Sequence, residues 1–289
     1  MIVKANAKVN FTLEVLGVRE DGYHDLRSIV VPISLADTIE ITPADHTELE
    51  IKDPLGFLGN RNCEGEKNLI IKAVRLMQRK FGVKDEVAII LEKKIPCGGG
   101  LGGGSADAAA TLKALNELWG INASEDELIN IGAELGSDIP ALILGGMVLM
   151  EGRGEKVSRL EVEKAHSYSL VLANPGVFCS TPEIFKLHKR GLSSKGNILY
   201  NMISSIASGD FKRVASALNN DLADTAYFRY PEIEQAAKSL KDAGCEGVSM
   251  SGSGATVFGV VRDEAQGRAI MDKIMNSNWI EFVHTCPVV

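Results

Sequence analysis

A run of glycines in the middle of the chain constrains its fold more than any other feature. Six of the seven residues from Gly98 to Gly104 are glycine, and an alanine-rich helical pattern follows directly. Glycine loses more backbone freedom on folding than any other residue, so such a cluster predicts positive φ angles or very close contact with another group. The first N–H groups of a helix are unpaired and carry about half a positive charge, which favours a phosphate. We therefore predict a phosphate-binding loop, with a flexible surface linker as the alternative.

The composition narrows the classes of protein to consider. The chain has 289 residues, of which 45% are hydrophobic, and this suits about two domains with real cores. A net charge of −7 argues against a nucleic-acid partner, although 31 Lys and Arg remain to build a local phosphate site. The cysteines show no C-x-x-C spacing, so we expect neither a disulfide framework nor a zinc site, and a reducing cytoplasm fits best. No apolar run is long enough to suggest membrane spanning.

The spacing of apolar residues predicts both strands and helices. From Val3 to Val15 apolar and polar residues alternate strictly, which is the pattern of a half-buried strand whose polar face includes Lys8. Leu26 to Ile41 continues as strand, with interruptions near Pro32 and at Asp37. Helices are predicted over 68–81, 108–119, 124–136, 181–188, 199–207, 211–219, 231–243 and 264–275, with a short one from 138. Strands are predicted over 87–91, 147–151, 155–160 and 168–173, as two strands around 251–254, and from 281.

The polar stretch Glu161 to His166 is the predicted domain boundary. It separates a first domain, residues 1–160, from a second domain, residues 161–289. The second domain has one strand, several helices, two strands, one helix and a final strand, which matches a ferredoxin-like split β-α-β sandwich. The sequence therefore predicts an α+β fold of two domains.

Two standard phosphate loops almost fit the glycine run. Gly98-x-Gly100-x-x-Gly103 satisfies the dinucleotide fingerprint, but that fold needs a second parallel strand after the helix, and here one helix leads directly into another. The Walker loop also nearly fits, except that Gly104 stands where its lysine should precede Ser105. What remains is a glycine loop at a helix N-terminus. The positive charge that the missing lysine would supply must come from a residue elsewhere in the chain.

Seven motifs, spread over nearly the whole chain, resemble those of one superfamily. The loop from Pro96 to Ser105 resembles the phosphate loop of the GHMP kinases, which include galactokinase, homoserine kinase and mevalonate kinase. The other motifs look like those of one branch, whose substrate is a sugar alcohol joined to cytidine diphosphate. They are Ala7-Lys-Val-Asn10, Asp21-Gly-Tyr-His24, Asn68-Leu69, Gly136-Ser-Asp-Ile-Pro140, Thr181-Pro-x-x-Phe185 and Ser251-Gly-Ser-Gly254. The resemblance implies a two-domain α+β fold with a mixed N-terminal sheet and an active site in the cleft between the domains.

The resemblance also implies which residues carry the chemistry. Phosphoryl transfer depends on positioning, charge neutralisation and an oriented nucleophile. Asp138 matches the family aspartate that accepts or orients the proton of the acceptor hydroxyl, and Lys8 matches the lysine that keeps this carboxylate ionised. On position alone, Asp138 is better interpreted as the N-cap of the next helix.

The substrate residues follow from the same motifs. Tyr23 and Phe185 match the aromatic pair that sandwiches the cytosine base, and His24 matches the residue that recognises the edge of the base. Asn10 holds the substrate or the aspartate, and Thr181 supports the base pocket. For His24, a surface histidine in a turn is the alternative.

ATP and Mg²⁺ are the cofactors that the resemblance implies. Ser105 directs its hydroxyl to a phosphate or to Mg²⁺, or else caps the helix. Asp107 departs from the family pattern, and we interpret it as an acid that complements the helix dipole. Asn68 and Lys93 match residues near the adenine, although they also fit a helix start and an exposed strand end. The other residues predicted to bind ATP are Pro96, Cys97, Gly98, Gly99, Gly100, Leu101, Gly102, Gly103, Gly104, Ser105 and Ala106.

We therefore predict an ATP- and Mg²⁺-dependent kinase of non-mevalonate isoprenoid precursor synthesis, which phosphorylates the 2-hydroxyl of its cytidyl substrate as a monomer or homodimer. One alternative is another GHMP kinase, of the homoserine or mevalonate type, which has no reason to keep Tyr23, His24 and Phe185 as a base pocket. Another is a nucleotide-binding regulator that has lost catalysis, against which an intact Lys8 and Asp138 argue.

Overall fold

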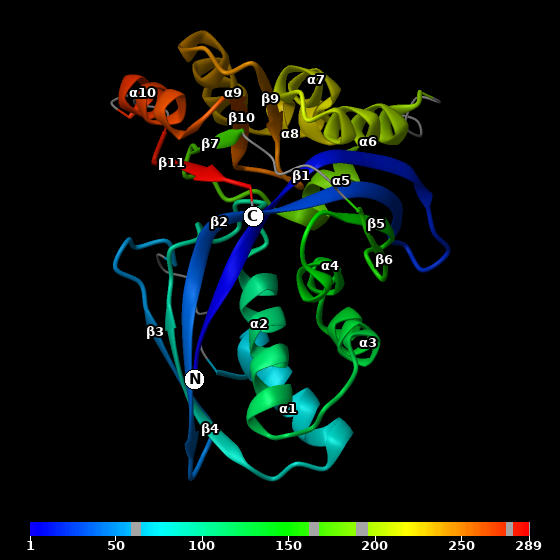
Figure 1. Cartoon of the computed structure of the whole chain (residues 1–289), viewed down its shortest axis with the longest axis vertical. Coiled ribbons are helices and arrows are strands. Elements are labelled where there is room, and N and C mark those ends of the chain that lie inside the picture. Colours follow the sequence, from blue (N-terminus) through cyan, green and yellow to red (C-terminus); the bar gives the residue numbers. More distant parts are fainter. Residues whose placement is uncertain (59–64, 162–167, 189–195, 276–279, 289) are drawn as a thin grey trace.

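The computed structural model describes residues 1–58, 65–161, 168–188, 196–275 and 280–288. Its strands are β1 (Ile2–Val18), β2 (His24–Ala44), β3 (Glu48–Lys52), β4 (Glu86–Glu92), β5 (Val148–Gly152), β6 (Lys156–Arg159), β7 (Ser169–Asn174), β8 (Asn219–Asn220), β9 (Gly247–Met250), β10 (Val257–Val261) and β11 (Phe282–Pro287). Among these residues, a seven-stranded sheet runs in the order β3-β4-β2-β1-β8, with β5 on β2 and β6 on β5, and a four-stranded sheet runs β11-β7-β10-β9. The long strands β1 and β2 reach from one sheet to the other (Figure 1).

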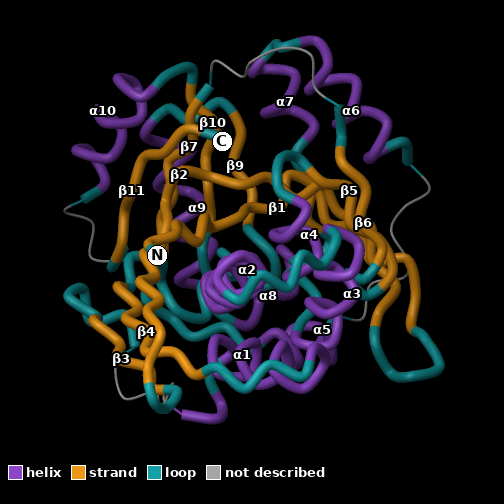
Figure 2. Tube along the Cα trace, turned by 60° about the horizontal axis from the view of Figure 1, so that its bottom comes forward, coloured by secondary structure: helices purple, strands orange, loops and turns teal. Residues whose placement is uncertain are grey.

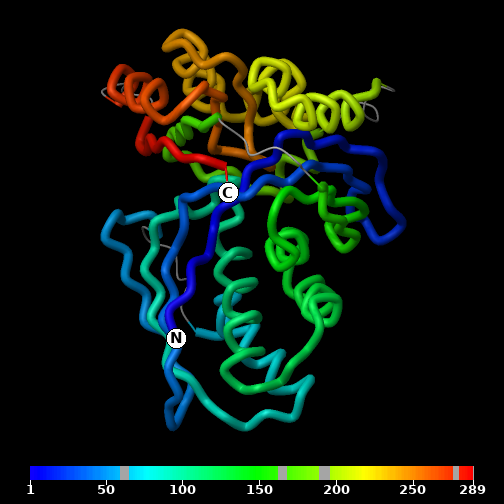
Figure 3. The backbone as a smooth tube through the Cα atoms, in the orientation of Figure 1, coloured from blue at the N-terminus to red at the C-terminus, as the bar shows by residue number. Residues whose placement is uncertain are grey.

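The helices are α1 (Leu69–Phe81), α2 (Gly103–Leu118), α3 (Glu125–Leu135), α4 (Ile139–Leu144), α5 (Thr181–Leu187), α6 (Ile198–Ser208), α7 (Phe211–Ala217), α8 (Ala223–Arg229), α9 (Pro231–Ala243) and α10 (Glu264–Ile274), with a short 3-10 helix over Gly65–Lys67. Helices α1 to α4 gather on one side of the large sheet, and α6, α7, α9 and α10 lie at the opposite end of the molecule (Figure 3). In Figure 2, α2 is seen nearly end-on in the middle of this arrangement. The glycine loop leads into α2 and therefore lies at the centre of the molecule.

Local signals explain several helix ends. The side chain of Asn68 accepts a hydrogen bond from the backbone N–H of Ile70 and caps α1. Ser124 and Glu127 form the predicted capping box at the start of α3. Helix α8 and strand β3 were not predicted, because α8 buries only Ala226 and β3 is an edge strand of five residues. Helix α8 gives no strong apolar period, and the alternation of β3, with Leu49 and Ile51 between charged residues, covers only five residues.

The smaller sheet confirms the predicted split β-α-β order. Its central strands β7 and β10 are neighbours, β11 and β9 lie outside them, and every pair is antiparallel. Among the described residues, the strand before the glycine loop, β4, pairs only with β3, which precedes it, and with β2, and helices α3 and α4 separate α2 from the next strand, β5. This topology agrees with the exclusion of the dinucleotide fold.

Strands β1 and β2 are longer and more buried than the alternation predicts. Strand β2 is continuous, so the predicted interruptions at Pro32 and Asp37 are wrong. Pro32 is tolerated because it lies between the segment that pairs with β5 and the segment that pairs with β4, and because a register shift adjoins it on the β1 side. Strand β1 is buried on both faces over residues 7–15, and its apolar face packs on the smaller sheet, where Phe11 stacks on Phe258 at 6.0 Å.

The two parts of the molecule share a core. Val9 and Phe11 of β1 pack with Leu172 of β7 and Phe258 of β10 in one cluster. Most of the predicted boundary lies outside the described residues, since 162–167 are not described, and the division at residue 160 stays a prediction. Within the described chain, the structure contains no helix with the length and apolar character needed to cross a membrane.

Candidate active site

The glycine loop is held in a shape that requires glycine. Gly98, Gly100 and Gly102 have φ angles of 70°, 77° and 69°. A Cβ atom on Gly100 would lie 2.1 Å from the backbone oxygen of Ser251. Three backbone carbonyl groups of the loop also accept hydrogen bonds from other parts of the chain. Leu101 O accepts from the N–H of Lys8 at 3.0 Å, Gly99 O from the N–H of Thr256 at 3.0 Å, and Gly100 O from the Ser251 hydroxyl at 2.9 Å.

The backbone N–H groups of the same loop are available to a ligand. In the described part of the chain, the N–H groups of residues 100–105 donate to no acceptor. Helix α2 is capped by Gly102, which has no side chain to satisfy them. The interpretation of Ser105 as the N-cap is therefore wrong, because Ser105 lies inside the first turn. Its hydroxyl faces Gly136, where a Cβ atom would be 3.9 Å away.

Lys8 and Asp138 meet beside this helix end. The ammonium nitrogen of Lys8 lies 3.4 Å from Asp138 Oδ2 and donates to Asn10 Oδ1 at 2.8 Å. Asp138 occupies the N-cap position of α4, as its place in the sequence predicts, but its side chain makes no capping hydrogen bond. The Lys8 side chain is 4% exposed and that of Asp138 is 30% exposed. The carboxylate is thus open to a substrate while the cation that neutralises it is buried.

A short hydrogen-bond chain orients Asn10. Its Nδ2 donates to Ser28 Oγ at 2.7 Å, and that hydroxyl donates to the carbonyl oxygen of Thr12. The amide oxygen of Asn10 must then face Lys8. Gly252 lies next to both side chains, because a Cβ atom on Gly252 would be 3.5 Å from Lys8 Nζ and 3.6 Å from Asn10 Oδ1. The Ser251–Gly254 loop of the second half therefore adjoins the ion pair.

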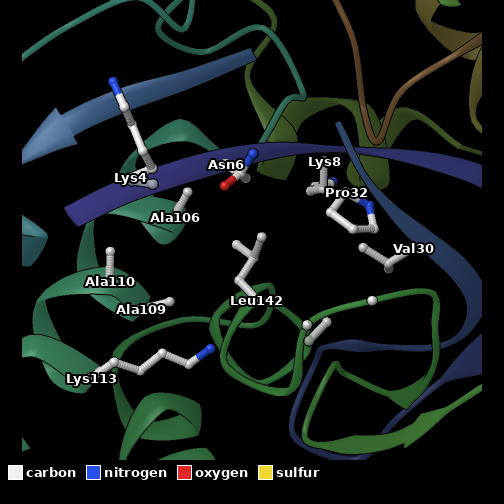
Figure 4. Close-up of a pocket in the computed structure, with 14 residues that line it drawn as sticks. Lys4, Asn6, Lys8, Val30, Pro32, Ala106, Ala109, Ala110, Lys113 and Leu142 are labelled. Carbon is white, nitrogen blue, oxygen red and sulfur yellow. The ribbon is translucent and has the colours of Figure 1, made fainter. Parts of the chain in front are cut away.

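A cavity of about 240 Å³ adjoins Lys8 between β1, β2, α2 and α4 (Figure 4). Apolar residues of both strands and both helices form most of its wall, and burial lowers the pKa of Lys113, which also lines it. This cavity could not be predicted from the sequence, because its wall combines residues from four elements. The lining residues are Lys4, Ala5, Asn6, Lys8, Val30, Pro32, Ala106, Ala109, Ala110, Lys113, Ala141, Leu142, Gly145 and Gly146.

The predicted base-binding residues are only partly brought together. His24 packs against Phe185, with ring centroids 4.8 Å apart and 33° between the planes. Tyr23 is 53% exposed and has the guanidinium of Arg153 over its ring at 5.5 Å. Arg153 was not predicted, and the sandwich of Tyr23 and Phe185 around a base stays a prediction. The hydroxyl of Thr181 lies 2.8 Å from that of Ser253, which connects α5 to the loop beside Lys8.

Lys93 is buried beneath the glycine loop. It is 2% exposed, so its interpretation as an exposed strand end is wrong, and its ammonium pairs with both Asp37 and Asp107. Burial lowers the pKa of Lys93, but the two carboxylates outweigh it and hold that pKa above its usual value. Burial raises the pKa of Asp107 above its usual value, against the opposing effect of Lys93. Asp107 is therefore part of a buried ion-pair cluster, and its interpretation as a simple dipole-complementing acid is wrong. Direct contacts of Lys93 and Asn68 with ATP stay predictions.

Comparison with known proteins agrees with this geometry. The GHMP kinases N terminal domain matches residues 68–146, and the GHMP kinases C terminal domain matches residues 202–281. A crystal structure of 4-(cytidine 5'-diphospho)-2C-methyl-D-erythritol kinase has a TM-score of 0.79 and 30% identity, covering 99% of both chains. A homoserine kinase from Cytophaga hutchinsonii, at 19% identity and a TM-score of 0.74 over 99% of this chain and 96% of its own, shows the shared fold alone. Fold and site together define a GHMP kinase.

Two bacterial relatives narrow the class further. A 4-diphosphocytidyl-2-C-methyl-D-erythritol kinase of Bacillus cereus (strain B4264) is 38% identical over 266 residues, 92% of this chain and 90% of its own. Its counterpart in Bacillus pumilus (strain SAFR-032) is 36% identical over 93% of this chain and 91% of its own. The chain belongs to the 4-diphosphocytidyl-2-C-methyl-D-erythritol kinase family. The predicted family and the two-domain α+β fold are thereby confirmed.

Proposed function

We propose that this protein transfers the γ-phosphate of ATP to the 2-hydroxyl of 4-diphosphocytidyl-2-C-methyl-D-erythritol, a step of non-mevalonate isoprenoid precursor synthesis. The observation that carries the proposal is the Lys8–Asp138 pair, with N···O 3.4 Å, next to a helix start whose N–H groups have no acceptor among the described residues. One part of this site suits donor phosphates, and the other suits an alcohol. Phosphoryl transfer requires both in one place.

The donor side fits ATP. The N–H groups of residues 100–105 and the start of α2 suit the ATP phosphates, and the buried ammonium of Lys8 adds the positive charge that a Walker lysine would otherwise supply. ATP supplies the transferred phosphoryl group. The described residues contain no cluster of three metal-ligating His, Cys, Asp or Glu side chains. This suits Mg²⁺, which commonly binds through substrate phosphates and few protein ligands, with the Ser105 hydroxyl as the ligand we propose.

On the acceptor side, Asp138 accepts or orients the proton of the 2-hydroxyl. Its carboxylate is exposed enough to reach a substrate, and the ammonium of Lys8 lies 3.4 Å from it. A general base of this kind contributes about 10² to 10⁴ in rate. Asn10 holds the substrate hydroxyls or the aspartate from the same strand face.

The cytidine end of the substrate lies toward Tyr23, His24 and Phe185. Thr181 links that pocket to the Ser251–Gly254 loop and so to Lys8. A base held between Tyr23 and Phe185 would lie beside Arg153 and His24, which contact those two rings. A homoserine or mevalonate kinase would not need this aromatic group. This difference favours the cytidyl substrate.

The test is an ATP-consumption assay with the cytidyl substrate, homoserine and mevalonate offered in parallel to wild type and to Asp138→Asn. We expect turnover with the cytidyl compound alone, and a loss of about 10² to 10⁴ in the variant. Asp126→Asn, an exposed carboxylate of α3, is the matched control and should act like wild type. Absence of turnover with the cytidyl compound would exclude the proposed substrate, and undiminished turnover in Asp138→Asn would exclude the role of that carboxylate.

A further inference from the structure

Both ends of the glycine loop are connected to one buried carboxylate, that of Asp37 on β2. Before the loop, Asp37 Oδ1 accepts hydrogen bonds from the backbone N–H groups of Lys94 and Ile95, the latter at 2.9 Å. Its other oxygen accepts from the ammonium of Lys93. That ammonium also pairs with Asp107 Oδ2 at 3.0 Å, on the helix that follows the loop. One carboxylate and one ammonium thus join the start of the loop to its end.

The cluster lies directly under the helix start. A Cβ atom on Gly103, the first residue of α2, would be 3.4 Å from Lys93 Nζ. Asp37, Lys93 and Asp107 are 0%, 2% and 4% exposed, so water screens their interactions little. Because Asp37 is fully covered, it cannot touch a bound nucleotide. Any effect of Asp37 on the reaction must pass through the backbone that it holds.

The outer attachments of the loop are of a different kind. They run from loop carbonyls to Lys8 and Thr256 and to the hydroxyl of Ser251, and they fix the side of the loop that faces β1 and the smaller sheet. Asp37 instead holds the segment that enters the loop and, through Lys93, the helix that leaves it. These inner contacts hold both segments that flank residues 100–105, whose N–H groups donate to no acceptor among the described residues.

We propose that Asp37 is a positioning residue of the phosphate loop, which acts through the N–H groups of Lys94 and Ile95 and through the ammonium of Lys93. This inference depends on the proposed binding of ATP phosphates by the loop. Removing the Asp37 carboxylate should weaken ATP binding and leave the cytidyl substrate, which contacts other elements, unaffected. A purely structural role would instead lower stability without separating the two substrates.

The matched pair Asp37→Asn and Asp37→Ala tests this. Both variants remove the negative charge and leave Lys93 with Asp107 alone, but only asparagine keeps an oxygen that can accept from the two backbone N–H groups. We expect Asp37→Ala to raise the KM for ATP about tenfold or more and to lower kcat, with the KM for the cytidyl substrate within about twofold of wild type. Asp37→Asn should lie clearly closer to wild type in its KM for ATP.

A second variant and a control keep the test decisive. Asp107→Asn leaves the hydrogen bonds of Asp37 intact but weakens the connection between Lys93 and α2. It should therefore raise the KM for ATP to a value between those of wild type and Asp37→Ala. It replaces Asp37→Ala if that variant does not fold. Asp263 caps α10 by accepting from the N–H of Gln266 at 2.8 Å, and α10 and α2 lie in different parts of the molecule (Figure 1). Asp263→Ala should lower the melting temperature with both KM values unchanged.

The wild-type assay separates failure of the inference from failure of the function. If wild type does not phosphorylate the cytidyl compound, the proposed function is wrong, and equilibrium binding of a non-hydrolysable ATP analogue to the same variants then tests Asp37. If wild type is active and folded Asp37→Ala keeps its KM for ATP, the inference is wrong. Equal increases in both KM values, or identical behaviour of Asp37→Asn and Asp37→Ala, would overturn it as well.

Discussion

The ammonium nitrogen of Lys8 lies 3.4 Å from a carboxylate oxygen of Asp138, although one residue belongs to the first strand and the other begins the fourth helix. Among the described residues, neither side chain has another charged partner, because the Lys8 ammonium otherwise donates only to the neutral amide of Asn10 and Asp138 makes no capping hydrogen bond. A nearly buried cation without a carboxylate is costly. The pair therefore acts as a unit.

A double-mutant cycle tests this unit. Lys8→Met and Asp138→Asn should each lower kcat by about 10² to 10⁴, because each removes either the proposed base or the positive charge beside it. The double variant should be no slower than the slower single variant, since the two residues share one function. Steady-state kinetics at saturating ATP give the four values. Lys80→Met, which breaks a surface ion pair with Glu134, is the control and should leave kcat unchanged. Additive effects of the Lys8 and Asp138 substitutions would show that the two residues act independently.

The base pocket gives a prediction about KM. Tyr23→Ala and Phe185→Ala should each raise the KM for the cytidyl substrate by the equivalent of about 1–3 kcal/mol, the range measured for base stacking, with the KM for ATP unchanged. Phe228→Ala is the matched control, because that ring is 89% exposed on α8 and should matter to neither substrate. An unchanged KM for the cytidyl substrate in both pocket variants would remove these rings from the base site.

Much of the fold could be predicted from the sequence, because the signals are local. The capping box at Ser124, the period of 3.6 residues from 68 to 81 and the alternation from Val3 to Val15 each depend on neighbouring residues. Long-range pairing is invisible at that level. The apolar pattern of β1 could not show that its polar face is also covered, and the sequence around Pro32 could not show the change of partner strand that accommodates it.

In the candidate site, too, some residues could be predicted from the sequence and others could not. Lys8 and Asp138 were found only through resemblance to a family, since nothing near either residue in the sequence indicates the other. Asp37 and the position of Lys93 were missed, because a buried charge looks like an exposed one until its partners are known. Arg153 was missed for a related reason, as its contact with Tyr23 joins two loops.

Gly100 should tolerate no side chain. Its φ of 77° is unfavourable for other residues, and a Cβ atom would lie 2.1 Å from Ser251 O, a backbone atom that cannot move aside easily. We expect Gly100→Ala to lose activity and to melt at a lower temperature. Gly120→Ala is the control, since its φ of 60° carries similar strain but the space around it is open. Equal losses of melting temperature in the two variants would show that the close approach to Ser251 has no effect.

His284 should make the protein less stable in acid. Burial lowers the pKa of His284 below its usual value, so the folded state favours the neutral ring. Above the unfolded pKa, about 6.5, both states are neutral; below it the unfolded chain binds the proton more readily, and stability falls with pH. His284→Phe should keep the stacking on Phe282, whose ring centroid lies 6.0 Å away, and remove this sensitivity. Urea midpoints between pH 8 and 5 should therefore shift in favour of the variant as the pH falls, whereas Phe228→Leu, at an exposed position without a titratable group, should show a constant difference from wild type. A constant difference for His284→Phe as well would mean that its protonation does not contribute to acid unfolding.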